Sequence, residues 1–297
     1  LRSSPRLTRL TRLLSTMASP VPCVAAMSVE AGASMLPHPS KAKSGGEDAF
    51  FIREQPPAVF GVFDGVGGWA RQGVDAGEFS RALAKDTAAH FARPAEVASS
   101  SMPAELEAAL SDGLSRSSCL GSCTACLVCV DCETATLTAL NVGDSGFRLF
   151  RPVADTLEVV AASDAQQHYF NCPRQLGSGS SDKPRDGDIY VEKVRVGDLL
   201  LLATDGVLDN LFDSEIAALL CEHTTSAAEL AARVASRARD VSFDETRRTP
   251  FAIEAVQQGY EMPGGKVDDI TVLLIKVLPG AVNESNEHLP QLPRSKL

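Results

Sequence analysis

The chain has 297 residues, of which 44% are apolar and 22% charged, a composition typical of a globular protein with one core of about 250 residues plus tails. No stretch reaches the roughly 18 uninterrupted apolar residues that a membrane-spanning helix needs, so we expect no membrane insertion. The net charge is −10, and residues 1–40 carry a net +3, so the remaining residues carry −13 and would repel nucleic acids.

The first 20 residues are rich in Arg, Ser and Thr, with four leucines at helical spacing: Leu7, Leu10, Leu13 and Leu14. This composition is typical of a mitochondrial transit peptide. The alternatives are a plastid or cytosolic location, a disordered basic tail, or translated leader sequence ahead of Met17. Because residues 1–40 contain five prolines and no apolar period, we expect a disordered targeting or linker segment there.

Downstream of residue 41, apolar strands are interrupted by pairs of helices. We predict strands at 49–52, 58–63, 124–130, 135–142, 147–151, 189–194, 198–203 and 270–277, and helices at 75–91, 103–114, 214–221, 227–239 and 250–258. This order favours an α+β fold over a doubly wound parallel sheet. Residues 163–188 form a polar excursion, and residues 279–297 are expected to be a flexible tail.

Five cysteines cluster between residues 119 and 132, which raises the possibility of a zinc site: Cys119, Cys123, Cys126, Cys129 and Cys132. However, residues 124–130 read as a buried strand, in which a spacing of three places successive side chains on opposite faces. No second Cys or His cluster completes a tetrahedral site. We therefore interpret these cysteines as packing residues.

Four apolar strands end in, or begin with, an aspartate: VFGVFD (59–64), ALNVGD (139–144), LLLATD (residues 200–205) and DDITVLLI (268–275). Any one of them is explained by the preference of Asp for turns. Their recurrence suggests carboxylates that converge at the end of a sheet, where their mutual repulsion requires cations. Ligands that are all oxygen select hard ions such as Mg²⁺ or Mn²⁺.

Five motifs occur in a fixed order: GEDA (46–49), FDGVGG (63–68), NVGDS (141–145), ATDGVLD (203–209) and DDITV (268–272). In this order the chain resembles the type 2C metal-dependent serine/threonine protein phosphatases over residues 41–277. DGVGGW (64–69) and SDAQQHYFN (163–171) resemble the branch that includes mitochondrial members. The implied domain is 41–278, a four-layer αββα sandwich of two antiparallel sheets flanked by antiparallel helix pairs.

The resemblance also implies a reaction and a set of site residues. A water bridging two divalent cations, Mg²⁺ or Mn²⁺, would hydrolyse phosphoserine or phosphothreonine in protein substrates. Asp64 would bridge the two ions, and the carbonyl of Gly65 would bind one of them. Asp205 and Asp268 would complete the ligands of one ion, and Glu47 would bind the other directly or through water. Asp48 would orient the ligands from behind, and Asp144 and Asp209 would offer a third, looser metal site. We expect a monomer.

Two departures from the family pattern affect the chemistry. The histidine that usually follows the Asp-Gly pair is replaced by Val66, which cannot move a proton, and His168 in the excursion is a weaker candidate for that role. The usual phosphate-binding arginine is matched by Lys43, which lacks a bidentate fork. Arg174 and Arg185 in the excursion could meet phosphorylated partners.

Other functions stay open at this point. A thiol phosphatase is disfavoured because no cysteine is followed six residues later by arginine. Val66 leaves open a catalytically weak protein that binds phosphoproteins on the same fold. The four acids Glu47, Asp64, Asp205 and Asp268 argue against it. A metalloprotein built on the cysteine cluster would instead contain zinc and unfold on chelation.

Overall fold

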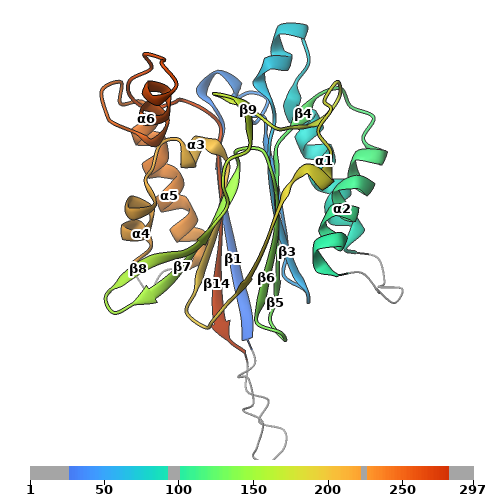
Figure 1. Cartoon of the computed structure of the whole chain (residues 1–297), viewed down its shortest axis with the longest axis vertical. Helices are drawn as coiled ribbons and strands as arrows, with labels where there is room; N and C mark the ends of the chain where they lie inside the picture. The colour runs from blue at the N-terminus through green and yellow to red at the C-terminus, as the bar shows by residue number, and fades with distance from the viewer. Residues whose placement is uncertain (1–26, 93–100, 222–225, 281–297) are drawn as a thin grey trace, which may run out of the picture.

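Two five-stranded antiparallel sheets pack face to face, with helices covering both outer surfaces, in the computed structural model of the chain (Figure 1). The structure describes residues 27–92, 101–221 and 226–280. The α+β sandwich predicted from the sequence is confirmed. The transit-peptide segment and most of the predicted tail fall outside the described residues. Within them, no helix is both long and apolar enough to cross a membrane.

The first sheet has the strand order β1 (Met27–Leu36), β14 (Ile270–Pro279), β13 (Leu199–Ala203), β7 (Gly146–Val153) and β8 (Thr156–Ala162). The second sheet has the order β12 (Asp188–Lys193), β6 (Thr136–Val142), β5 (Ala125–Asp131), β3 (Ala58–Asp64) and β2 (Asp48–Arg53). Within each sheet the central strands are almost wholly buried. This follows from their continuous apolar runs, because both faces of these strands are covered.

The helices lie in two groups outside the sheets. The second sheet is covered by α1 (Ala76–His90) and α2 (Met102–Arg116), and the first by α4 (Asp213–Leu220) and α5 (Ala227–Ser242). The short α3 (Asp205–Leu208) begins directly after β13, and α6 (Pro250–Gln257) precedes β14. Side-chain caps start α1 and α5: the Asp75 carboxylate accepts from the Gly77 N–H, and Ser226 forms a capping box with Glu229.

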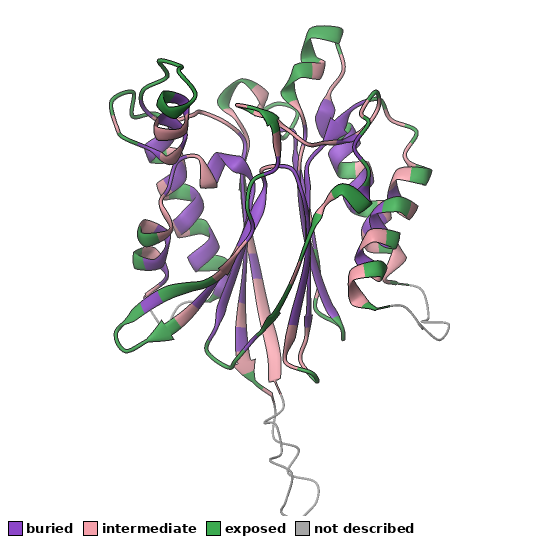
Figure 2. Cartoon of the chain, viewed as in Figure 1, coloured by how far each residue is buried: buried purple, intermediate pink, exposed green. Residues whose placement is uncertain are grey.

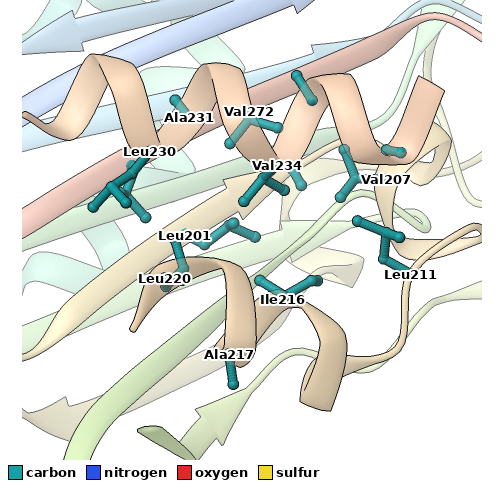
Figure 3. Packing of buried hydrophobic residues seen from close by; sticks show 14 of the residues in the cluster. Leu201, Val207, Leu211, Ile216, Ala217, Leu220, Leu230, Ala231, Val234 and Val272 are labelled. Carbon is teal, nitrogen blue, oxygen red and sulfur yellow. The ribbon is translucent and has the colours of Figure 1, made fainter. Parts of the chain in front are cut away.

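Three apolar layers hold the sandwich together, as the buried segments in Figure 2 show. Between the sheets lie side chains such as Phe60, Phe147 and Leu200. Between the first sheet and its helices, Leu201 meets Leu220 and Leu230 (Figure 3). Between the second sheet and α1 and α2 lies a third cluster. Burial on both faces of each sheet is what makes this a four-layer architecture.

The expectation that residues 1–40 are unstructured is wrong for Met27–Leu36, which forms β1 and pairs with β14 along its whole length. Its sequence, MSVEAGASML, is rich in small residues and lacks the β-branched run that signals a strand. The small residues have a packing role. A Cβ on Gly32 would lie 2.1 Å from the Ala228 backbone nitrogen, so only glycine allows α5 to approach β1 this closely.

The strand β8 was also missed, because most of its residues are half or fully exposed and show no clean alternation. The excursion 163–188 contains short paired segments: β9 (Gln167–Tyr169) with β10 (Cys172–Pro173), and β11 (Leu176–Gly177) with β4 (Ser122–Cys123). The clustered cysteines are packing residues. Cys126 faces the core between the sheets, whereas Cys123 and Cys129 face the helices, and all are free thiols.

Candidate metal centre

The aspartates at the strand ends meet at one end of the sandwich. Asp64 ends β3, Asp144 follows β6 and Asp205 follows β13, and each offers a carboxylate oxygen within 4.8 Å of the other two. Asp268, which precedes β14, lines the same pocket of about 230 Å³. Gly65 bridges to Cys123 of β4, so the pocket lies at the end where β4 is labelled in Figure 1. Four strands, two from each sheet, therefore deliver acids to one pocket.

The electrostatics of this cluster are unfavourable without a counter-charge. Burial, followed by the charge of Asp205, raises the pKa of Asp64 well above its usual range, and the same two causes raise the pKa of Asp144. The Oδ1 atoms of Asp144 and Asp205 are buried and receive no hydrogen bond from any residue that the structure describes. Unpaired, converging carboxylate oxygens are the donor set that a hard divalent cation fits.

A lysine that the sequence analysis did not single out enters the cluster. The Lys266 ammonium forms an ion pair with Asp205 and lies 2.8 Å from Asp209 Oδ2 and 3.4 Å from Asp268 Oδ2. Burial opposes ionisation of Asp205, but the charge and hydrogen bond of Lys266 outweigh it and lower the pKa of that carboxyl. The available signal was that Lys266 is the only basic residue between 249 and 275, two positions before Asp268.

Behind the cluster, Asp48 joins the two sheets. Its Oδ2 accepts hydrogen bonds from Thr204 Oγ1 at 2.9 Å and Thr271 Oγ1 at 2.7 Å, and the residue is 1% exposed. Asp48 also lies opposite Asp64 in the register between β2 and β3. The carboxylate is thus held by two hydroxyls, one following β13 and one on β14, directly beside the acid cluster.

Glu47 and Gly65 lie together on the other side of Asp64. The Gly65 N–H donates to the Glu47 carbonyl at 3.1 Å, and a Cβ on Gly65 would lie 2.6 Å from that oxygen, so only glycine fits. The Glu47 carboxylate lies 2.5 Å from the Lys41 ammonium, which also lies 2.9 Å from Asp269 Oδ2. Glu47 is therefore paired with a cation at the edge of the pocket.

The remaining predicted residues are placed differently. Lys43 is exposed and does not line the pocket, whereas Lys41 does. Val66 lines it, but His168 does not: its Nε2 lies 2.9 Å from Asp182 Oδ2. The excursion instead contributes Asn171 and Pro173 to the pocket.

The two arginines of the excursion lie away from the acids. The Arg174 guanidinium donates to the Asp186 carbonyl at 2.9 Å, and Arg185 is exposed. Neither lines the pocket. Their suggested contact with phosphorylated partners is therefore not supported by a position near the acid cluster.

Comparison with known proteins identifies relatives of this chain. The family model described as "Stage II sporulation protein E (SpoIIE)" matches residues 60–278. "Probable protein phosphatase 2C 80" of Arabidopsis thaliana is 38% identical over 247 residues, covering 82% of this chain and 57% of its own length. "Protein phosphatase PTC7 homolog" of Xenopus laevis is 39% identical over 243 residues, covering 77% of this chain and 80% of the relative.

Solved structures share the fold. The X-ray structure of the photosystem II phosphatase PBCP has a TM-score of 0.76 and 31% identity, covering 85% of this chain and 100% of that one. The catalytic domain of serine threonine protein phosphatase PstP, in complex with 2 manganese ions, has a TM-score of 0.56 at 19% identity, covering 85% and 99%, which shows the fold alone. This chain spans a little over half the length of the first Arabidopsis relatives, 57% and 55%.

Proposed function

The chain belongs to the protein phosphatase 2C family, and we propose that it hydrolyses phosphoserine and phosphothreonine in proteins with two divalent cations, Mg²⁺ or Mn²⁺. The observation that carries the proposal is the meeting of Asp64, Asp144 and Asp205 within 4.8 Å. The Oδ1 atoms of Asp144 and Asp205 are buried without a hydrogen-bond partner among the described residues, which a bound cation would explain.

Four acids have proposed roles as metal ligands. Asp64, Asp205 and Asp268 would hold one ion, and Asp64, Glu47 and the Gly65 carbonyl would hold the other. When bound, the ions supply a water nucleophile at neutral pH and neutralise the charge of the phosphoryl oxygens. Asp48 would act as a positioning residue, because its hydroxyl partners fix the strands that carry Asp205 and Asp268.

Lys41 takes over the phosphate-binding role that the sequence suggested for Lys43. Its ammonium reaches the pocket and is anchored by Glu47 and Asp269, and those two acids raise its pKa against the opposing effect of burial. A fixed ammonium beside the acid cluster would attract a phosphoryl dianion as a point charge. We further propose that the chain acts in mitochondria, on the composition of residues 1–20.

The test is hydrolysis of a phosphothreonine peptide with Mn²⁺, with Mg²⁺ and with EDTA, with Asp64→Asn as the inactive control. We expect turnover that depends on metal and is absent in Asp64→Asn. Binding of the phosphopeptide without turnover in any metal would instead favour the phosphoprotein-binding alternative, which the replacement of histidine by Val66 keeps open.

A further inference from the structure

The Lys266 side chain is the most enclosed cation of the described pocket lining, with 16% of its surface exposed against 26% for Lys41. Its ammonium is in contact with three carboxylates, those of Asp205, Asp209 and Asp268. A lysine on the open surface would not place its charge among these carboxylates. The contacts of the rest of Lys266 show whether the fold fixes this position.

The backbone of Lys266 is clamped by a buried amide. Its N–H donates to Asn210 Oδ1 at 2.9 Å, and its carbonyl accepts from Asn210 Nδ2, also at 2.9 Å. The same Nδ2 donates to the carbonyl of Gly206 in α3, and Asn210 is 0% exposed. Because α3 begins with Asp205 and is followed by Asp209, this one amide ties Lys266 to the segment that carries two of its three partners.

Aromatic rings cover the ammonium on another side. The Lys266 Nζ lies 5.4 Å from the centroid of the Phe251 ring, close enough for a cation–π contact. Phe251 stacks on Phe170 at 5.3 Å, and Phe170 stacks on Tyr260 at 5.0 Å. These rings connect α6 to the excursion, so the lysine is enclosed by parts of the chain that are distant in sequence. The fold therefore fixes the position of the Lys266 ammonium.

Lysine and metal would use different oxygens. All three carboxylates present Oδ2 to Lys266, while Oδ1 of Asp205 is buried without a donor among the described residues. Asp144 Oδ1, in the open triad with Asp64 and Asp205, is likewise without a donor. The ammonium therefore neutralises one side of Asp205 and leaves the other side available.

We propose that Lys266 is a permanent cation of the metal centre, and that it holds Asp209 out of ion binding so that the site takes two divalent cations and no third. The family resemblance had assigned Asp144 and Asp209 to a third site. Among the described residues, the carboxylate oxygens that meet within 4.8 Å belong to Asp64, Asp144 and Asp205, and Asp209 is not part of this group. Its Oδ2 lies 2.8 Å from the Lys266 ammonium instead.

The inference rests on the metal-binding part of the proposed function, and its test is independent of turnover. The number of Mn²⁺ ions bound per chain is measured by calorimetry and by elemental analysis, for the parent, Lys266→Met, Asp209→Asn and the double variant. We expect two ions for the parent, three for Lys266→Met, and two for both variants that contain Asp209→Asn. Circular dichroism checks that each variant is folded.

Three results would overturn the inference. They are three ions in the parent, loss of an ion in Asp209→Asn, or two ions bound more tightly in Lys266→Met, which would mean that the ammonium competes with a metal. The Asp209→Asn count can still overturn the inference if Lys266→Met does not fold, because an ion lost with this carboxylate would mean that Asp209 binds metal in the parent. A parent that binds two ions but hydrolyses no phosphopeptide would contradict the proposed function and leave this inference standing.

Discussion

Replacement of Thr204 by valine tests whether Asp48 is held by hydroxyls behind the metal centre. The Thr204 hydroxyl donates to Asp48 Oδ2 at 2.9 Å and also accepts from the Thr271 N–H at 3.0 Å. Valine keeps the shape of the side chain and removes both interactions. Because the residues are buried, no water replaces the lost partner without cost.

The expected loss follows from these two bonds. A hydrogen bond to a charged group contributes about 1.5–3 kcal/mol, and an unpaired buried N–H adds to the loss, so Thr204→Val should destabilise the fold by about 3 kcal/mol. In a domain of this size each kcal/mol lowers Tm by about 2–4 °C, which gives a decrease of about 6–12 °C.

The loss should also depend on pH. Burial, followed by the charge of Asp269, raises the pKa of Asp48, while the two threonine hydroxyls act in the opposite direction because they stabilise the ionised form. Their contribution is therefore present when Asp48 is ionised and is lost as the pH falls through its folded-state pKa. In metal-free protein, the destabilisation by Thr204→Val should be larger at about pH 8 than at about pH 5.

Urea unfolding of the EDTA-treated protein at both pH values measures this effect. Thr87→Val is the matched control, because the Thr87 hydroxyl is also fully buried but has no hydrogen-bond partner among the described residues. It should not lower stability, because the change removes a buried hydroxyl that makes no hydrogen bond. A Thr204→Val protein as stable as the control at pH 8, or one that loses more stability at pH 5, would refute the reasoning.

Three further predictions concern the acids and the sandwich. Asp64→Asn should lower the hydrolysis of p-nitrophenyl phosphate with Mn²⁺ by at least about 100-fold while the circular dichroism spectrum is unchanged, and activity within a few fold of the parent would remove Asp64 from the site. Gly32→Val should destabilise the fold by about 3 kcal/mol in urea unfolding, because its Cβ would lie 2.1 Å from the Ala228 nitrogen; a neutral result would show that α5 does not pack there. In EDTA, Tm should fall as the pH rises from about 4 to about 7. Burial raises the pKa of Asp64 and Asp144, and that of Asp209 to about 7, so the folded state binds more protons than the unfolded state over this range. Mn²⁺ should remove this pH dependence, and a Tm that rises with pH in EDTA would contradict the prediction.

Much of the site was visible in the sequence. Asp64, Asp144 and Asp205 each stand at the end of an apolar run, and a run of that kind predicts both the strand and its end. Motif order then indicated the family, which the comparisons confirm. The strand β1 was not visible, because its register comes from pairing with β14, which lies more than 200 residues further along the chain.

Local geometry explains why neither Lys41 nor Lys266 was identified from the sequence. Counting back from Glu47 favoured Lys43, but the 3-10 turn η1 (Pro39–Lys41) and the left-handed backbone of Gly45 and Gly46 bring Lys41 into the pocket instead. The position of Lys266 depends on its hydrogen bonds to Asn210, 56 residues earlier, and on the rings that cover it. Neither contact has a sequence spacing that signals it.

We propose above that strand ends from both sheets hold divalent cations between their carboxylates. Crystals soaked in Mn²⁺ and measured at the manganese absorption edge test it most directly. We predict two anomalous peaks, each within about 2 Å of its carboxylate ligands, one of them shared between Asp64 and Asp205. A pocket without a manganese peak, in which Lys266 is the only cation on these aspartates, would contradict the account.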